Sequence, residues 1–179
     1  MNKILVNQEE LNLIENNFPM LIHGEERSGA SLYTVTLAVN LFSQGFLVVF
    51  LCGYPQAEEE FAKQVGGVFY KDQVVFYTKE KVLEFKEFVI NPNNGKRIIF
   101  VKNIELFGED VLDLVLAKDK IVLSGDVNKC DSKDQIFDTK FNTKIYFSNL
   151  DNVVLPALQK YEGFFVSGNL EGVTKVKFI

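Results

Sequence analysis

Short apolar runs recur along this chain, and longer segments of mixed polarity separate them. A continuous apolar run bounded by polar or glycine residues is typical of a strand that is buried on both faces of a parallel sheet. Six runs predict such strands, at residues 18–23, 46–51, 74–77, 98–101, 121–123 and 144–147. The remaining segments predict helices at residues 8–16, 32–44, 56–65, 78–90, 105–116 and 132–141. Strands that alternate with helices in this way predict an α/β fold, with a mostly parallel sheet covered by helices on both faces.

The segment at residues 56–65 has the clearest helical pattern. Ala57, Phe61 and Val65 recur at a spacing of four residues, which places them on one face of a helix. Three glutamates stand near the start of the segment and Lys63 stands near its end, as the helix dipole favours. Two glycines follow directly and predict where the helix stops.

The last part of the chain has a different pattern. Two apolar runs, residues 163–168 and 173–179, flank the turn sequence at residues 169–172. In the second run Lys175 and Lys177 alternate with apolar or small residues, so that one face is more polar than the other. This pattern predicts a C-terminal antiparallel β-hairpin at an edge of the sheet.

Length and composition indicate a single domain with a substantial core. The chain has 179 residues, of which 47 % are hydrophobic, and we expect one domain over residues 1–179. Within it, residues 1–17 form an N-terminal extension and residues 163–179 form the terminal hairpin. Seventeen phenylalanines and no tryptophan indicate that phenylalanine supplies much of the packing.

Charge and cysteine content bear on the partners and on the cellular location of the protein. The net charge is −5, which argues against direct binding of nucleic acid, because a general electrostatic grip needs a basic surface. Cys52 and Cys130 lie far apart and have no metal-ligand spacing, so they indicate buried, reduced thiols. The N-terminus lacks the apolar core of a signal peptide and no apolar run is long enough to span a membrane. These features predict a cytoplasmic protein without membrane insertion.

A glycine-bounded loop follows the first predicted strand. The loop reads Gly24, Glu25, Glu26, Arg27, Ser28, Gly29, Ala30, Ser31. It has the spacing of the phosphate-binding motif G-x-x-x-x-G-K-[ST], and it lies between a strand and a helix as that motif requires. In an intact motif the backbone N–H groups hold the phosphates, the lysine reaches the outer phosphates and the hydroxyl holds Mg²⁺. Alanine replaces the lysine here, so the loop is a degenerate Walker A motif and a vestigial or weak nucleotide site.

With these elements in order, the chain resembles the RecA-like P-loop ATPases, and within them the FtsK–HerA branch, which includes DNA translocases and the coupling ATPases of conjugation. The resemblance covers residues 18–179 and is carried by residues 24–31, 48–53, 97–103 and 138–179. In the last segment, residues 141–147 resemble the family's late core strand and residues 161–168 resemble its closing hairpin. The resemblance implies a three-layer RecA-like fold.

The departures from that family fall on its catalytic positions. The strand at residues 98–101 ends in the family with a metal-binding aspartate and a water-activating glutamate, whereas this chain has Lys102 and Asn103 there. A lysine near the expected Mg²⁺ position opposes metal binding, and an asparagine cannot act as a carboxylate base. The family's polar sensor, often glutamine, corresponds at best loosely to Asp126. Because phosphoryl transfer depends on positioning and electrostatic stabilisation, these replacements together predict an inactive site.

Each of four side chains in this region has two interpretations. Arg27 could replace the loop lysine or pair with a neighbouring glutamate, and Ser31 could hold Mg²⁺ or cap the helix that follows. Glu105 could be a displaced catalytic acid or a carboxylate that a helix dipole stabilises. His23, the only histidine, is more typical of a structural residue than of a catalytic one.

Three functions follow from this mixture of a retained loop and lost catalytic residues. The first is a catalytically inactive P-loop ATPase-like protein that binds or scaffolds other proteins, such as an active ATPase, in a DNA-processing or secretion assembly. The second is a nucleotide sensor that binds ATP or ADP weakly, with or without Mg²⁺, and does not hydrolyse it. The third is an active ATPase that uses unusual residues such as Arg27 and Glu105. The first needs no cofactor, and a homo-oligomer is compatible with all three.

Overall fold

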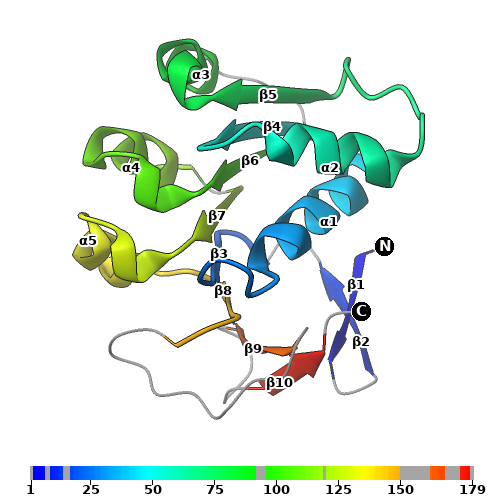
Figure 1. Cartoon of the computed structure of the whole chain (residues 1–179), viewed down its shortest axis with the longest axis vertical. Helices are drawn as coiled ribbons and strands as arrows, with labels where there is room; N and C mark the ends of the chain where they lie inside the picture. Colours follow the sequence, from blue (N-terminus) through cyan, green and yellow to red (C-terminus); the bar gives the residue numbers. More distant parts are fainter. Residues whose placement is uncertain are drawn as a thin grey trace.

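The computed structural model describes residues 2–6, 9–13, 17–91, 96–118, 120–149, 162–167 and 174–177. Its main sheet has eight strands in the order β10-β9-β8-β3-β7-β6-β4-β5 (Figure 1). The six strands from β8 to β5 are parallel to one another, and β9 and β10 extend the sheet as antiparallel strands. A separate two-stranded antiparallel sheet is formed by β1 (Asn2–Val6) and β2 (Glu9–Leu13).

The strands of the main sheet match the predicted apolar runs closely. Their bounds are β3 (Met20–His23), β4 (Leu47–Cys52), β5 (Val74–Thr78), β6 (Arg97–Lys102), β7 (Ile121–Gly125), β8 (Thr143–Tyr146), β9 (Glu162–Ser167) and β10 (Thr174–Lys177). The central strands β3, β4, β6 and β7 are buried along almost their whole length, as expected for strands with helices on both faces. The predicted C-terminal hairpin is confirmed in β9 and β10, whereas its turn at residues 169–172 lies outside the described residues.

Helices cover both faces of the sheet, which gives three layers (Figure 1). On one face lie α1 (Ala30–Ser43) and α2 (Gln56–Val65). On the other lie α3 (Val82–Ile90), α4 (Glu109–Leu116) and the short α5 (Lys133–Asp138). Three single turns of 3-10 helix, η2 (Lys79–Lys81), η3 (Ile104–Leu106) and η4 (Val127–Lys129), follow the ends of β5, β6 and β7. The predicted three-layer α/β fold with a mostly parallel sheet is therefore confirmed.

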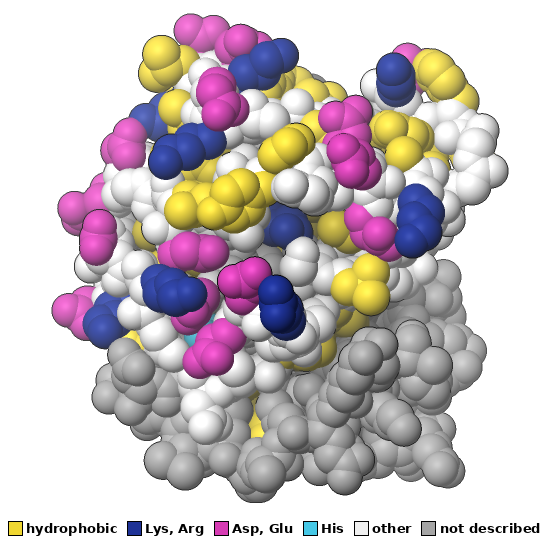
Figure 2. Space-filling view, viewed as in Figure 1, with side chains coloured by type: hydrophobic (Ala, Val, Ile, Leu, Met, Phe, Trp, Pro, Cys, Tyr) yellow, Lys and Arg dark blue, Asp and Glu magenta, His cyan; other side chains and the backbone are white. Residues whose placement is uncertain are grey.

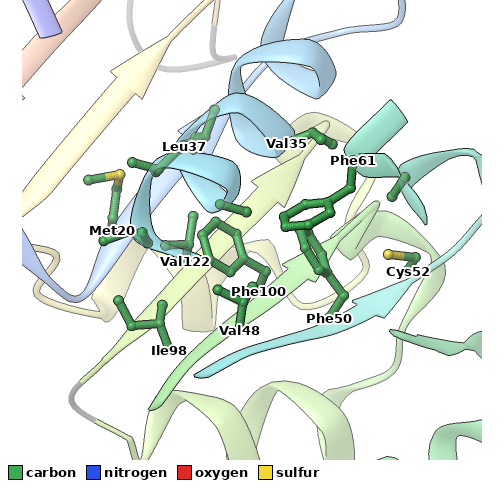
Figure 3. Close-up of a cluster of buried hydrophobic side chains, with 14 of the residues drawn as sticks. Met20, Val35, Leu37, Val48, Phe50, Cys52, Phe61, Ile98, Phe100 and Val122 are labelled. Carbon is green, nitrogen blue, oxygen red and sulfur yellow. The ribbon is translucent and has the colours of Figure 1, made fainter. Parts of the chain in front are cut away.

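Phenylalanine forms the centre of the core beneath α1 and α2 (Figure 3). Phe50 of β4 stacks on Phe76 of β5 with ring centroids 4.8 Å apart, and lies 5.0 Å from the ring of Phe100 in β6. Phe61 of α2 meets Phe50 edge-on at 6.4 Å. The rings on adjacent strands thus hold α2 against the sheet, and the expectation that phenylalanine supplies much of the packing is confirmed.

Several predicted boundaries are wrong, and one predicted element is of the wrong type. The helix predicted at residues 8–16 is wrong, because Glu9–Leu13 forms the strand β2, which pairs with β1. The helix predicted at residues 105–116 is split into η3 and α4 by Phe107 and Gly108, both of which have extended backbone. The helix predicted at residues 132–141 ends at Asp138, and Phe141 is buried in the core instead.

The structure also bears on the two cysteines and on membrane insertion. Cys52 and Cys130 are both free and buried, as predicted. Across the described ranges, no helix combines the length and the apolar character that crossing a membrane requires.

Candidate functional site

The glycine loop connects the end of β3 to the start of α1, at the edge of the sheet where all the parallel strands end (Figure 1). In open parallel sheets, ligands bind at this edge. Gly24 begins the loop and donates its N–H to the carbonyl of Gly125 in β7, at 3.1 Å. A side chain at Gly24 would meet Cβ of Ala30 at 2.5 Å and Cβ of Phe147 at 3.1 Å. The loop therefore packs closely over its first residue, and only glycine fits there.

The loop has a defined conformation that turns its backbone into the first turn of α1. Arg27 has a left-handed φ of 65° and Gly29 a φ of 99°. The N–H of Ser28 donates to the carbonyl of Glu25 at 3.1 Å, and the hydroxyl of Ser28 accepts the N–H of Ala30 at 3.4 Å. The loop thus remains compact around the helix start, although its lysine is missing.

Two of the open interpretations on the loop can now be compared with the structure. Ser31 is the second residue of α1 and is exposed, while Gly29 occupies the N-cap position, so Ser31 does not cap the helix. Arg27 is exposed, and among the described residues it makes no ion pair with Glu25 or Glu26. Both side chains line the cleft that the loop borders.

A cleft of about 1060 Å³ lies between the loop, α2 and the ends of β6 and β7. Its lining includes all the loop residues from Gly24 to Ser31 except Ser28, together with Lys102, Asn103, Glu105, Ser124 and Asp126. The structure therefore brings the degenerate loop and the degenerate acidic-motif positions, which are far apart in sequence, to one site.

Lys102 occupies an unusual place in this cleft. It ends β6 on the same face of the sheet as Phe100, which is the face that α1 covers, and it is only 6 % exposed. Its neighbours in the sheet are Cys52 on β4 and Ser124 on β7. Burial lowers the pKa of the Lys102 ammonium, while the carboxylate of Glu105 opposes that effect. None of the described hydrogen bonds or ion pairs involves its ammonium group.

Asn103 and Glu105 shape the wall beside Lys102. Asn103 has a left-handed φ of 64° and precedes the single turn η3. That turn places Glu105 so that its carboxylate accepts the N–H of Asp126 at 3.1 Å. Glu105, in the first turn of η3, thus joins the end of β6 to the end of β7.

Asp126 serves the structure of the same wall. Its carboxylate accepts the N–H of Asn128 at 3.2 Å and pairs with Lys129 at 3.3 Å, and it is buried. Within the described ranges, no group of three His, Cys, Asp or Glu side chains converges in a way that could hold a metal ion.

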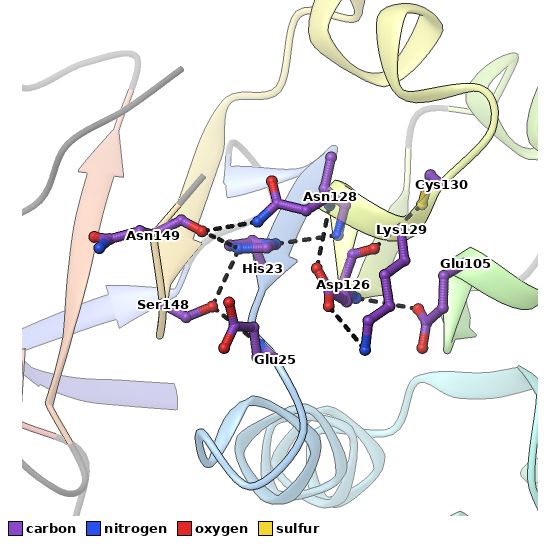
Figure 4. A network of polar contacts seen from close by, with 10 residues as sticks. His23, Glu25, Glu105, Asp126, Asn128, Lys129, Cys130, Ser148 and Asn149 are labelled. Carbon is purple, nitrogen blue, oxygen red and sulfur yellow. Dashed lines mark hydrogen bonds and ion pairs between the residues drawn. The ribbon is translucent and has the colours of Figure 1, made fainter. Parts of the chain in front are cut away.

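His23 is the centre of a polar network behind the loop (Figure 4). Its Nδ1 accepts the N–H of Val127 at 3.1 Å, so its Nε2 carries the proton and donates to the carbonyl of Asn149 at 3.1 Å. The hydroxyl of Ser148 lies 3.2 Å from Nε2 and accepts the N–H of Glu25 at 3.0 Å. Burial lowers the pKa of His23. The histidine therefore ties the loop to the ends of β7 and β8.

Two of these features could not be predicted from the sequence. The link between α1 and β7 is a 2.7 Å hydrogen bond between the hydroxyls of Thr34 and Ser124, and neither residue belongs to a recognisable motif. The depth of Lys102 depends on the register of three strands. Acidic and basic side chains both line the cleft, and Figure 2 shows the two kinds interspersed over the described elements on one face of the molecule.

No protein-family model and no curated protein matches this sequence. Solved structures do match its fold. The genome packaging NTPase B204 from Sulfolobus turreted icosahedral virus 2, in complex with ATPγS, superposes with a TM-score of 0.64 at 11 % identity, covering 93 % of this chain and 100 % of that one. This chain has the RecA-like P-loop fold.

Two further structures agree with this fold. The flagellar accessory protein FlaH from Methanocaldococcus jannaschii has a TM-score of 0.52 at 14 % identity, covering 83 % of this chain and 76 % of that one. The cytoplasmic domain of EssC has a TM-score of 0.59 at 13 % identity, covering 99 % of this chain and 42 % of that one. At such low identity the likeness concerns architecture, since one fold can carry many functions.

Proposed function

We propose that this protein is a P-loop ATPase-like protein of the FtsK–HerA type that does not hydrolyse nucleotide and works by binding other proteins. The observation that carries the proposal is the buried Lys102 at the strand end where the family it resembles has a metal-binding aspartate. A cation there repels Mg²⁺, and the adjacent Asn103 cannot activate water as a carboxylate does. Ala30 removes the loop cation as well, so three parts of the catalytic apparatus are replaced.

The nearest carboxylates do not compensate for these losses. Glu105 is engaged with the backbone of Asp126, and Asp126 is engaged with Asn128 and Lys129. A general base needs a free carboxylate aimed at the attacking water. These contacts instead give both residues a role in holding the ends of β6 and β7.

An exposed apolar segment beside an edge strand supports the protein-binding half of the proposal. Phe69 is 70 % exposed and Val68 is 57 % exposed, in the connection that leads from α2 into β5. The strand β5 ends the sheet on that side, and strand edges with apolar neighbours are common docking points for other chains. We place the protein beside an active P-loop ATPase in a DNA-processing or secretion assembly, as the family it resembles suggests.

Turnover is the first test of the proposal. The purified full chain with Mg²⁺ and ATP should release no phosphate above the buffer rate. Turnover that disappears in Arg27→Ala or Glu105→Gln would instead make the protein an ATPase with non-standard residues. A contaminating ATPase would keep its rate in both variants, so the two variants separate an intrinsic activity from an impurity.

The protein-binding half needs a separate test. Cross-linking of the full chain in its own cells should join it to a P-loop ATPase, and Phe69→Ser should reduce that yield. Leu83→Ser is a matched control, because Leu83 is 71 % exposed and lies on α3, away from the connection that carries Phe69. Equal losses in the two variants would argue against a specific surface at Phe69.

A second function is favoured by one feature of the cleft. Its floor carries a buried lysine and its rim carries the loop and the start of α1, an arrangement that suits an anion. A nucleotide sensor that binds ATP or ADP without hydrolysis therefore remains the second candidate.

A further inference from the structure

The side chain of Lys102 is buried in the wall of the cleft, and its ammonium group has no hydrogen bond or ion pair among the described residues. The side chain is 6 % exposed and lines the cleft together with the loop residues. Among the described residues, no hydrogen bond or ion pair reaches its nitrogen. Burying an unpaired charge is costly, and large buried cations are normally paired. An anion that enters the cleft would therefore find this ammonium group available as a donor.

The position of Lys102 in the sheet determines where its side chain can act. Register places it between Cys52 of β4 and Ser124 of β7, all on the face that α1 covers. Ser124 is bonded to Thr34, one turn into α1. Lys102 and Ala30, the first residue of α1, both line the cleft.

We propose that Lys102 supplies, from the end of β6, the positive charge that Ala30 removed from the loop, and that the cleft binds a phosphate chain without Mg²⁺. The proposal rests on the second candidate function, the nucleotide sensor. The phosphate chain could belong to a nucleoside triphosphate or be inorganic, and the recognition chemistry is the same for both. In the family that this chain resembles, a metal-binding aspartate stands at the position of Lys102. The lysine therefore neutralises the anion as the metal ion does in that family.

The remaining parts of an anion site come from the loop and helix. The helix α1 has 14 residues, and its N-terminus presents unsatisfied N–H groups and a positive dipole end. Of the loop N–H groups, those of Glu25, Ser28 and Ala30 are bonded within the protein. The N–H groups of Glu26, Arg27, Gly29 and Ser31 have no partner among the described hydrogen bonds, and those of Gly29 and Ser31 lie at the start of α1.

The acidic side chains around the cleft do not occupy this position. Glu105 and Asp126 lie on the wall and are held by their own partners. Glu25 and Glu26 of the loop are exposed, as is Arg27, and on the α2 side of the cleft Glu59 is exposed and Glu60 is half-buried. The charge at the floor of the cleft therefore belongs to Lys102, and the acidic residues at the rim reduce the affinity without blocking the site.

Calorimetric titration of the full chain with inorganic pyrophosphate, and separately with ATP, tests the proposal. We expect saturable binding in EDTA, and a loss of affinity of about ten- to hundredfold in Lys102→Met, because a hydrogen bond to a charged group is removed. Lys71→Met is the control, since Lys71 is exposed and does not line the cleft. It should bind about as wild type does. ATP that binds like pyrophosphate means that only the phosphate chain is recognised, and tighter binding of ATP means that the nucleoside is recognised too.

Two further readouts distinguish this role from a structural one. Without an anion, Lys102→Met should raise the midpoint temperature of thermal unfolding by about 2–4 °C, because a buried charge without a hydrogen-bond partner is removed. Lys102→Gln serves as a second variant if the methionine side chain disturbs packing. Mg²⁺ should leave pyrophosphate binding unchanged or weaken it.

Three results would overturn the proposal. They are no binding of millimolar pyrophosphate in EDTA, equal binding by wild type and both Lys102 variants, or binding that requires Mg²⁺. Each is independent of the turnover assay. A protein that neither hydrolyses ATP nor binds pyrophosphate refutes the anion site and leaves the non-hydrolysing function standing, whereas turnover refutes that function whatever the titration shows.

Discussion

His23 is bonded at both ring nitrogens, and each bond fixes one property of the imidazole. Nδ1 accepts the N–H of Val127, so it cannot carry a proton without losing that bond. Burial acts in the same direction and lowers the pKa of the ring. Since this is the only histidine, its titration is directly visible by NMR. We expect a pKa below the ordinary value of about 6.5 and the Nε2–H tautomer in two-bond ¹⁵N–¹H correlation spectra.

The same residue gives a pH dependence of stability. Between the lowered pKa of the folded state and about pH 6.5, the unfolded chain binds a proton that the folded chain does not. The free energy of unfolding therefore falls as pH falls through this window, by about 1.4 kcal/mol for each pH unit within it. Urea unfolding of wild type and His23→Asn at pH 7.5 and 5.5 measures the difference. An equal loss in both proteins would mean that His23 does not contribute.

At the scale of elements, the end of β7 packs closely against the turn η3 that follows β6. Gly125 ends β7 with a φ of 154°, and a Cβ there would lie 2.8 Å from the backbone nitrogen of Ile104, with the Glu105 carboxylate also in its way. Backbone cannot move aside as a flexible side chain can. Gly125→Ala should destabilise the protein by about 2–4 kcal/mol in urea unfolding.

Gly45 provides the control for that substitution. It has a φ of 82°, but a Cβ there would meet nothing within 4 Å. Gly45→Ala therefore adds only the strain of a left-handed backbone, about 1 kcal/mol. If both variants lost the same free energy, the packing of η3 against β7 would not be what requires glycine at residue 125.

The strands and helices of the main fold were predictable because each is specified locally. The helix α2 has its bounds as predicted, since glutamates, a regular apolar face and two glycines all mark it. The apolar run at residues 98–101 predicted β6 because little other than a buried strand fits so short and so apolar a segment. The helix predicted at residues 8–16 was wrong for the opposite reason. Their pattern is short and ambiguous, and pairing of β2 with β1 decided the outcome.

Several residues that line the candidate site could be named from the sequence, but their arrangement in space could not. The spacing of Gly24 and Gly29 located the loop, and the resemblance to the FtsK–HerA branch singled out Lys102 and Asn103. The burial of Lys102 depends on the register of β4, β6 and β7, which no local pattern encodes. The contacts of His23 reach residues 104 and 126 positions away, so its role in anchoring the loop could not be read from its neighbours.

At the scale of the whole molecule, the fold resembles that of a DNA-packaging protein, whereas the net charge does not favour binding to DNA. The similarity to a genome packaging NTPase concerns the architecture, whereas binding to DNA depends on the surface. Positive and negative side chains are interspersed on the face that Figure 2 shows, and the net charge is −5. Counterion release, which drives non-specific binding to DNA, needs several lysines or arginines that act together on adjacent phosphates. The protein therefore lacks the overall charge that such binding requires.

We accordingly expect no direct binding of the full chain to single- or double-stranded DNA. Fluorescence polarisation of a labelled oligonucleotide at about 50 mM salt should stay unchanged up to about 100 µM protein, a range that detects ordinary non-specific binding. Low salt is the demanding condition, because weak electrostatic contacts are strongest there. A signal that falls steeply between about 50 and 200 mM salt would contradict the expectation, since it would reveal a local basic surface that the net charge conceals. A signal that salt does not change would instead indicate stacking of the bases on exposed aromatic rings, such as those of Phe69 and Tyr54.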